Sequence, residues 1–170
     1  LRRFLREREA LVARVDADPA IAAAHPRWLY RLLRESHPTR LPQLIAANNE
    51  SPAMVLRVNA LRTTRAAMLD LLAGQGVVAA PGLADTSIVL ETASDVTAVP
   101  GFEAGLVSVQ DAGAQRAAAL LDARPGQRVL DACAAPGGKA CHLLEHTPGI
   151  ELLALDVDAA RIERVRQKLA

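Results

Sequence analysis

The chain has 170 residues, of which 51% are hydrophobic and only 2% aromatic, and its formal net charge is +1. This apolar content excludes an intrinsically disordered chain, and with so few aromatic residues the core must be built from Leu, Val, Ile and Ala. No apolar run approaches the roughly 20 residues that span a bilayer, and the N-terminus lacks a signal-peptide pattern. We therefore expect a soluble, cytoplasmic protein without a membrane partner.

The first 40 residues carry a charge imbalance that the net value hides, with nine arginines against five acidic residues. A basic region can neutralise RNA phosphates, but a solvated arginine face has the same pattern and is favoured on charge alone. Apolar spacing predicts a helix over residues 1–16 and a short helix or linker over 20–24. Another helix is expected after His25-Pro26, with Trp28 as a packing anchor.

Residues 37–123 are expected to contain a small α/β unit. After a short helix that starts near His37-Pro38, residues 54–59 alternate as in a strand, with Met54, Leu56 and Val58 on one face. Arg57 and Asn59 fall on the polar face. They are equally well interpreted as RNA contacts and as an ordinary exposed face.

The rest of this unit combines one helix with short strands. Thr63 or Thr64 can cap the helix, and its inward-facing residues are expected to be Met68, Leu69, Leu71 and Leu72. Further strands are predicted at residues 77–80, 87–91 and 106–110. Asp111 can then cap a helix over residues 112–121.

A strand, a glycine turn and a helix follow over residues 128–145. Residues 128–133 form an apolar run with one acid, typical of a buried parallel strand, and the turn Ala-Ala-Pro-Gly-Gly ends it. The helix is expected from Lys139, with Leu143 and Leu144 facing the sheet. A second strand over residues 150–156 ends in Asp156. Asp158 can cap a last helix whose inward-facing residues are Ile162, Val165 and Leu169.

Strand, glycine turn and helix form the nucleotide-binding arrangement of doubly wound α/β folds. Cys133 stands where a phosphate-binding P-loop needs its first glycine, and the dinucleotide fingerprint is absent. An adenosine ligand without phosphate, such as S-adenosylmethionine, fits better, and Asp156 has the position of an acid that binds ribose hydroxyls. The alternative is a glycine turn that binds no ligand.

No metal site is expected. Two cysteines, Cys133 and Cys141, are too few for a disulfide framework or a zinc site. His142 and His146 lie four residues apart on the predicted helix, but further ligand residues are lacking nearby. We interpret them as two surface histidines.

The segment Asp131-Ala-Cys-Ala-Ala-Pro-Gly-Gly-Lys139 resembles the cofactor motif of the RNA cytosine-5 methyltransferases. Residues 47–59 and 100–111 resemble two upstream signatures of that family, and the order along the chain is the same. The combination is most similar to subfamily B, whose bacterial members act on 16S ribosomal RNA. The resemblance implies the start of a doubly wound, Rossmann-like methyltransferase fold over residues 124–170. A small α/β RNA-docking unit over 37–123 would precede it, after the end of a helical RNA-binding domain over 1–36.

The resemblance also implies the chemistry. Members of the family transfer a methyl group from S-adenosylmethionine to carbon 5 of cytosine through a cysteine–cytosine adduct. Their catalytic cysteines lie in downstream Pro-Cys and Thr-Cys motifs, which do not occur in residues 1–170. We therefore assign no catalytic residue and expect the sequence to be a fragment. The implied cofactor-binding residues are Cys133, Ala134, Ala135, Pro136, Gly137, Gly138, Lys139 and Asp156, and Arg161 matches a basic position that contacts the cofactor in some relatives.

Two other functions remain open. One is a cytosine-5 methyltransferase that acts on transfer RNA or another ribosomal site. The other is a non-catalytic RNA-binding module in ribosome assembly.

Overall fold

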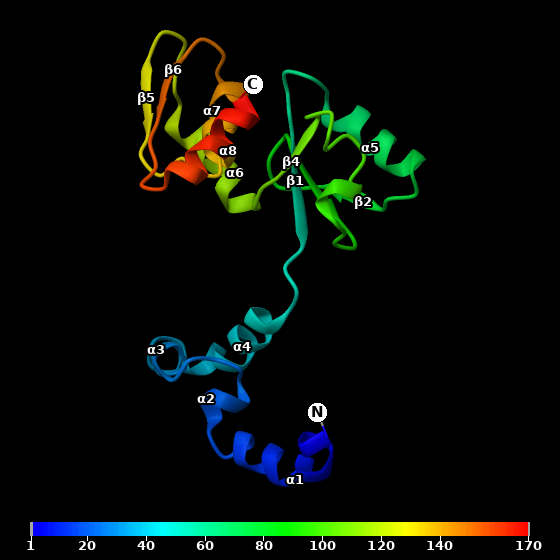
Figure 1. The fold of residues 1–170 in the computed structure, drawn as a ribbon, viewed down its shortest axis with the longest axis vertical. Coiled ribbons are helices and arrows are strands. Elements are labelled where there is room, and N and C mark those ends of the chain that lie inside the picture. Colours follow the sequence, from blue (N-terminus) through cyan, green and yellow to red (C-terminus); the bar gives the residue numbers. More distant parts are fainter. Residues whose placement is uncertain (1, 170) are drawn as a thin grey trace. The chain divides into compact units, whose positions relative to one another are not determined.

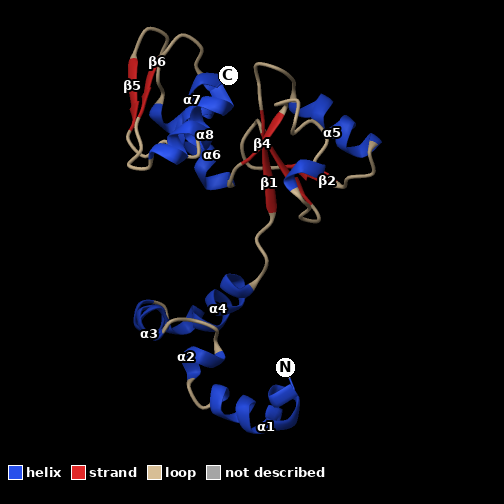
Figure 2. Ribbon diagram, viewed as in Figure 1, coloured by secondary structure: helices blue, strands red, loops and turns tan. Residues whose placement is uncertain are grey.

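The computed structural model describes residues 2–169, without the side chain of Lys168, and the chain divides into two compact units, Leu1–Pro52 and Ala53–Ala170. Figure 1 follows the chain through both units, and Figure 2 shows that the strands belong to the second. No helix within residues 2–169 combines the length and the apolar character needed to cross a membrane. The predicted boundaries after residues 36 and 123 stay a prediction.

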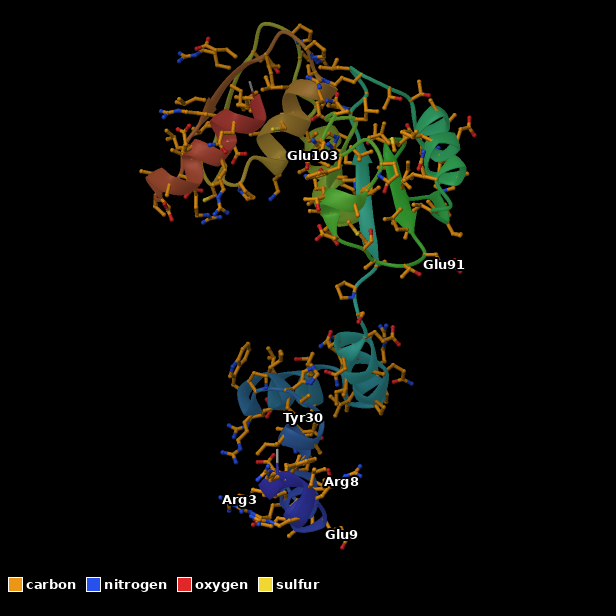
Figure 3. All side chains as sticks on the ribbon, turned by 45° about the vertical axis from the view of Figure 1, so that its right-hand side comes forward. Arg3, Arg8, Glu9, Tyr30, Glu91 and Glu103 are labelled. Atoms are coloured by element: carbon orange, nitrogen blue, oxygen red, sulfur yellow. The ribbon has the colours of Figure 1, made fainter. Side chains whose placement is uncertain are left out.

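The first unit is helical. It contains α1 (Arg2–Asp16), α2 (Pro19–Ala22), α3 (Arg27–Ser36), the 3-10 helix η1 (Pro38–Arg40) and α4 (Leu41–Asn49). Asp18 caps α2, because its carboxylate accepts a hydrogen bond from the amide of Ala20 at 2.9 Å. Trp28 is 68% exposed, so its prediction as a packing anchor is wrong. Figure 3 shows the side chains of this unit, with Arg3 and Arg8 on α1 and Tyr30 on α3.

The second unit begins with an antiparallel sheet of strand order β2-β3-β1-β4. The strands are β1 (Met54–Val58), β2 (Ala79–Pro81), β3 (Ser87–Leu90) and β4 (Val107–Val109), and α5 (Arg65–Gly74) and the 3-10 helix η2 (Val96–Ala98) complete this part. Thr64 caps α5 by accepting a hydrogen bond from the amide of Ala67 at 3.2 Å. The core between α5 and the sheet consists of Leu56, Val58, Met68, Leu72, Ile88, Leu90, Val99 and Val107. Leu71, predicted to face inward, is 38% exposed instead.

The same unit continues with α6 (Ala112–Leu121), β5 (Arg128–Asp131), α7 (Gly138–His146), β6 (Glu151–Ala154) and α8 (Ala159–Leu169). β5 and β6 pair in parallel, with Val129 opposite Leu152. These two residues pack against α6 and α7, whereas Leu130 and Leu153, which point to the other face, are 59% and 54% exposed. Leu152 also packs against Val165 of α8, so all three helices cover one face of the strand pair (Figure 2).

Within this part, two aspartates cap helices as predicted. Asp111 accepts a hydrogen bond from the amide of Gly113, and Asp158 accepts one from the amide of Ala160, both at 2.8 Å. Val165 is buried on the inner side of α8, but Leu169 is 45% exposed, against expectation. The predicted fold class, α/β with the start of a methyltransferase domain after a smaller α/β unit, is confirmed.

Candidate functional site

The glycine turn lies between the end of β5 and the start of α7. Gly137 occupies the N-cap position of α7 with a φ of 98°, a left-handed conformation that favours glycine. Its amide donates to the carbonyl of Ala134 at 2.7 Å, which closes the turn. A methyl group added at Gly138 would meet nothing in the described residues closer than the side-chain amide of Gln110, 3.8 Å away. A side chain at this position would therefore point toward Gln110 at ordinary van der Waals distance, without a clash.

Asp156 lies against this turn. Its Oδ2 accepts a hydrogen bond from the amide of Ala135 at 3.0 Å, and the amide of Ala134 donates to the carbonyl of Leu155 at 2.9 Å. Both contacts join the carboxyl ends of two adjacent parallel strands, where ligands bind in open α/β sheets. The structure therefore brings the predicted acid and the predicted turn together.

The carboxylate of Asp156 is held in its ionised form. Hydrogen bonds from the amides of Asp158 and Ala135, with a smaller contribution from the charge of Arg161, lower its pKa below the ordinary value. Each of its two oxygens accepts one of these amide hydrogen bonds. A carboxylate oxygen has two lone pairs, so both oxygens keep capacity to accept another donor.

Arg161 lies beside the same group. Its Nη2 donates to the carbonyl of Ala135 at 3.1 Å, and its Nη1 lies 3.9 Å from Oδ1 of Asp156. The side chain is 49% exposed, so it reaches the site from its rim. Cys133 and Lys139, the other polar residues predicted for the site, are both exposed.

Asp131, at the end of β5, lies next to the turn and was not among the predicted site residues. Its Oδ1 accepts a hydrogen bond from the amide of Cys133 at 3.3 Å. Its buried Oδ2 has no hydrogen-bond partner among the described residues. Asp131, Ala132 and Lys139 also line a cavity of about 220 Å³ next to the turn. The available signal was the single acid at the end of an otherwise apolar strand.

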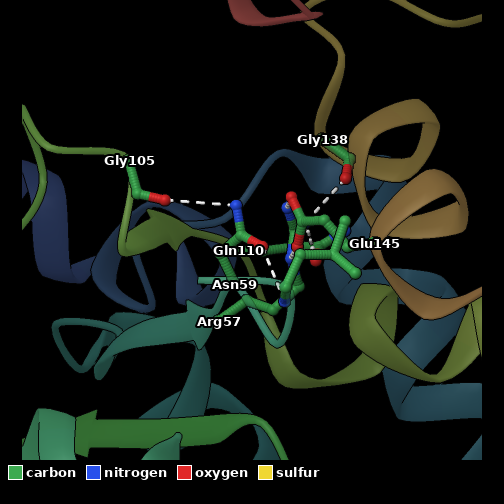
Figure 4. Close-up of polar contacts among 7 residues, drawn as sticks. Arg57, Asn59, Gly105, Gln110, Gly138 and Glu145 are labelled. Carbon is green, nitrogen blue, oxygen red and sulfur yellow. Dashed lines mark hydrogen bonds and ion pairs between the residues drawn. The ribbon is translucent and has the colours of Figure 1, made fainter. Parts of the chain in front are cut away.

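Arg57 connects the antiparallel sheet to α7. It is only 1% exposed, and its Nε and Nη2 donate to the two carboxylate oxygens of Glu145 at 3.0 and 2.7 Å. Its Nη1 donates to Oε1 of Gln110 and to the carbonyl of Gly138, both at 2.7 Å (Figure 4). The prediction that Arg57 belongs to an exposed or RNA-contacting face is therefore wrong. Strand alternation identifies two faces, and α7 covers the one that was expected to be open.

The second residue of that expected face, Asn59, makes a local contact. Its side-chain amide donates to the carbonyl of Gly105 at 3.2 Å, and the side chain is half-buried (Figure 4). Asn59 therefore ties the end of β1 to the loop before β4.

His142 differs from its prediction as a surface residue, because it is only 6% exposed. Burial, the charge of Arg57 and the neighbouring His146 together lower its pKa to about 4. His146 is exposed, as predicted, and the centroids of the two rings lie 5.9 Å apart. Within residues 2–169, no group of three or more His, Cys, Asp or Glu residues is arranged to hold a metal ion.

The donor and acceptor set around the turn has a defined chemical character. Asp156 presents spare carboxylate lone pairs, and the amides at the N-terminus of the nine-residue helix α7 favour an anionic group. Oδ2 of Asp131 is an unpaired acceptor among the described residues. A ligand that combines adjacent hydroxyls, a carboxylate and an ammonium group satisfies all three, and S-adenosylmethionine has this combination. The role of each predicted site residue stays a prediction.

Two family models match the chain. A ferredoxin-like domain of RsmF/B-like methyltransferases matches residues 25–97, and the 16S rRNA methyltransferase RsmB/F model matches residues 118–170. Among curated proteins, the ribosomal RNA small subunit methyltransferase B of Pseudomonas putida is 50% identical over 99% of this chain and 39% of its own length. That of Vibrio cholerae is 45% identical over the same shares. The chain thus spans about two fifths of the length of these relatives.

Solved structures show the same fold. PH0851 has a TM-score of 0.78 at 26% identity, over 85% of this chain and 33% of its own. A methyltransferase homologue from Pyrococcus horikoshii has a TM-score of 0.77 at 24% identity, over 88% of this chain and 50% of its own. NSun6 from Pyrococcus horikoshii, solved with SFG, has a TM-score of 0.73 at 13% identity, over 85% of this chain and 62% of its own.

Proposed function

Since this chain belongs to the RsmB/F family of 16S ribosomal RNA methyltransferases, we propose that it carries the methyl-donor site of a cytoplasmic enzyme. In this proposal the enzyme methylates carbon 5 of a cytosine in 16S ribosomal RNA. The methyl donor of such enzymes is S-adenosylmethionine. In this proposal residues 124–170 begin the methyltransferase domain. Residues 37–123 form the RNA-docking unit, and residues 1–36 end a helical RNA-binding domain.

One observation carries the proposal: the hydrogen bond of 3.0 Å between the amide of Ala135 and the carboxylate of Asp156. It joins the glycine turn after one parallel strand to the acid after its neighbour. This is the combination with which doubly wound folds bind the ribose of a nucleoside.

The residues around the turn have separate roles in the proposal. Asp156 accepts hydrogen bonds from the two ribose hydroxyls. The backbone from Cys133 to Gly138, together with Lys139, lies along the methionine portion, whose carboxylate is stabilised by the N-terminus of α7. Asp131 accepts a hydrogen bond from the methionine ammonium, which supplies the partner that its Oδ2 lacks among the described residues.

The cofactor supplies an electrophilic methyl group on a sulfonium. Carbon 5 of cytosine is a poor nucleophile, and attack of a thiolate on carbon 6 makes it electron-rich. The Pro-Cys and Thr-Cys motifs that carry these thiols in the family are not among residues 1–170. Residues 1–170 therefore bind and orient the donor, and the proposal assigns none of them to the adduct.

The proposal is tested by titrating the full chain with S-adenosylhomocysteine in a calorimeter. Asp156→Ala removes both ribose acceptors, so we expect the dissociation constant to rise by roughly tenfold or more. Asp158→Ala is the matched control, because it also removes a carboxylate that accepts backbone amide hydrogen bonds, but at the start of α8 and not at the turn. The control should bind nearly as well as the parent. Equal affinities for Asp156→Ala and the parent would exclude this site.

A further inference from the structure

A single buried side chain connects the antiparallel sheet to both ends of the helix that follows the glycine turn. Arg57 lies on β1, Gly138 opens α7, and Glu145 lies in the last turn of α7. The guanidinium contacts Gly138 through the carbonyl and Glu145 through the carboxylate, at distances of 2.7 to 3.0 Å (Figure 4). Both ends of α7 are therefore fixed to one group.

The guanidinium is itself held in one orientation. Oε1 of Gln110 accepts from the same Nη1 that donates to Gly138. The backbone of Gln110 is fixed in turn. Its main-chain amide donates to the carbonyl of Val55 at 3.0 Å, and its main-chain carbonyl accepts from the side chain of Gln115 at 2.9 Å. Arg57 thus donates to acceptors on three residues, and none of these residues is exposed.

We propose that Arg57 is a positioning residue for the cofactor site and acts without contacting the cofactor. By holding the carbonyl of Gly138, it fixes the first turn of α7 and the glycine turn before it in the orientation that presents their amides to the cofactor. This inference rests on the proposed function, since it assigns a support to the same site. A remote group of this kind acts on affinity, because a turn that is already ordered loses less conformational freedom when the ligand binds.

The chemistry of the contact requires arginine. A guanidinium is planar and has five N–H donors, so it can pair with a carboxylate through two atoms and still donate to two other acceptors. A lysine keeps the charge but has one nitrogen with three donors. It cannot reach Glu145 with the same geometry and also hold Gly138 and Gln110.

The test compares Arg57→Lys with the parent in the full chain. We expect Arg57→Lys to fold and to bind S-adenosylhomocysteine roughly tenfold more weakly, the effect of losing one hydrogen bond to a charged group. Hydrogen exchange should accelerate at the amides of residues 137–141 and stay unchanged in the core strand β3. A residue that only stabilised the fold would produce neither the local change nor the loss of affinity.

Two core variants serve as controls for stability. Ile88→Val and Leu72→Ala remove buried methyl groups between α5 and the sheet, away from the turn, and bracket a wide range of destabilisation. Both should bind S-adenosylhomocysteine as the parent does. If they lose affinity as Arg57→Lys does, the effect is general destabilisation and the inference is wrong.

The remaining outcomes are also decisive. If the parent binds and Arg57→Lys binds equally well, Arg57 is not a positioning residue, although the proposed site stands. If the parent itself does not bind, the proposed function fails together with the inference. Should Arg57→Lys not fold, Gln110→Met takes its place, because it removes the neighbouring acceptor of Nη1 and leaves the ion pair intact. It should weaken binding several-fold, and parent-like binding would overturn the inference.

Discussion

Removing one member of the buried pair Arg57–Glu145 should cost at least as much stability as removing both. Arg57 is 1% exposed and the side chain of Glu145 is 12% exposed, so little water is available to replace a lost partner. Glu145→Leu leaves a buried guanidinium with two neutral acceptors, and Arg57→Met leaves a largely buried carboxylate. Breaking a buried pair in this way typically costs about 3–5 kcal/mol.

The double variant Arg57→Met/Glu145→Leu removes both charges together. It leaves Oε1 of Gln110 and the carbonyl of Gly138 without the guanidinium, at about 1–3 kcal/mol for each unsatisfied group. Apolar contact between the new side chains offsets part of this loss. We therefore expect the double variant to be no less stable than Arg57→Met alone. The coupling energy then equals or exceeds the cost of Glu145→Leu, at least about 3 kcal/mol.

Urea unfolding followed by circular dichroism measures the four free energies of the cycle. Midpoints and slopes are fitted separately, because an altered slope would indicate a change in the denatured state. A coupling energy below about 0.5 kcal/mol would refute the reasoning, since that value is typical of exposed ion pairs. The buried ion pair would then contribute no more to the free energy of unfolding than an ion pair at the surface.

Three further predictions concern a helix cap, pH and RNA. Thr64→Ala should lower stability by about 1 kcal/mol, because the amide of Ala67 loses its acceptor, and thermal unfolding measures the change. The pKa of His142 is about 4 in the folded chain and near 6.5 when unfolded, so the unfolded state binds the proton first on acidification. Stability should therefore fall as pH decreases from about 6.5 to about 4, by at most about 1.4 kcal/mol per pH unit from this group, and urea midpoints of His142→Gln should show a flatter pH dependence. Affinity for a 16S ribosomal RNA fragment should decrease as salt rises, with a logarithmic slope of about −0.7 to −0.9 per neutralised phosphate, and a binding assay indifferent to salt would contradict an electrostatic contact.

The local features of the fold could be predicted from the sequence because neighbouring residues determine them. Thr64, Asp111 and Asp158 cap helices through amides two or three residues further along the chain. The glycine turn and Asp156 follow the same logic, since each stands at the end of a strand, and parallel pairing then brings them to one edge.

Features that depend on which surface another element covers could not be predicted. The alternation of β1 distinguishes two faces but does not say that α7 packs on the face of Arg57. His142 is buried for a related reason, because it lies on the side of α7 that packs near Arg57. The charge of Arg57 is close enough to contribute to the lowered pKa of His142. Leu71 and Leu169 show the opposite error, since helical spacing alone overestimated the width of the buried stripe.

The turn and the acid of the candidate site were predicted from the sequence, but the contact with Arg57 and the unpaired oxygen of Asp131 were not. The motif pointed to the turn from Cys133 to Gly138 and to the distant Asp156. Nothing in the local pattern linked the turn to Arg57, which is 81 residues from Gly138 in the chain. Asp131 was visible as a lone acid in an apolar strand, but its unpaired oxygen became apparent only once its neighbours among the described residues were known.

The contact between Arg57 and Glu145 joins residues 88 positions apart, which bears on the order of folding. Closing so long a segment has an entropic cost that shorter contacts avoid, so the sheet can form before the ion pair does. As the chain is synthesised, the strands of the sheet leave the ribosome before Glu145 does. Until Glu145 reaches Arg57, the guanidinium stays hydrated. Formation of the ion pair then removes water from a charged group.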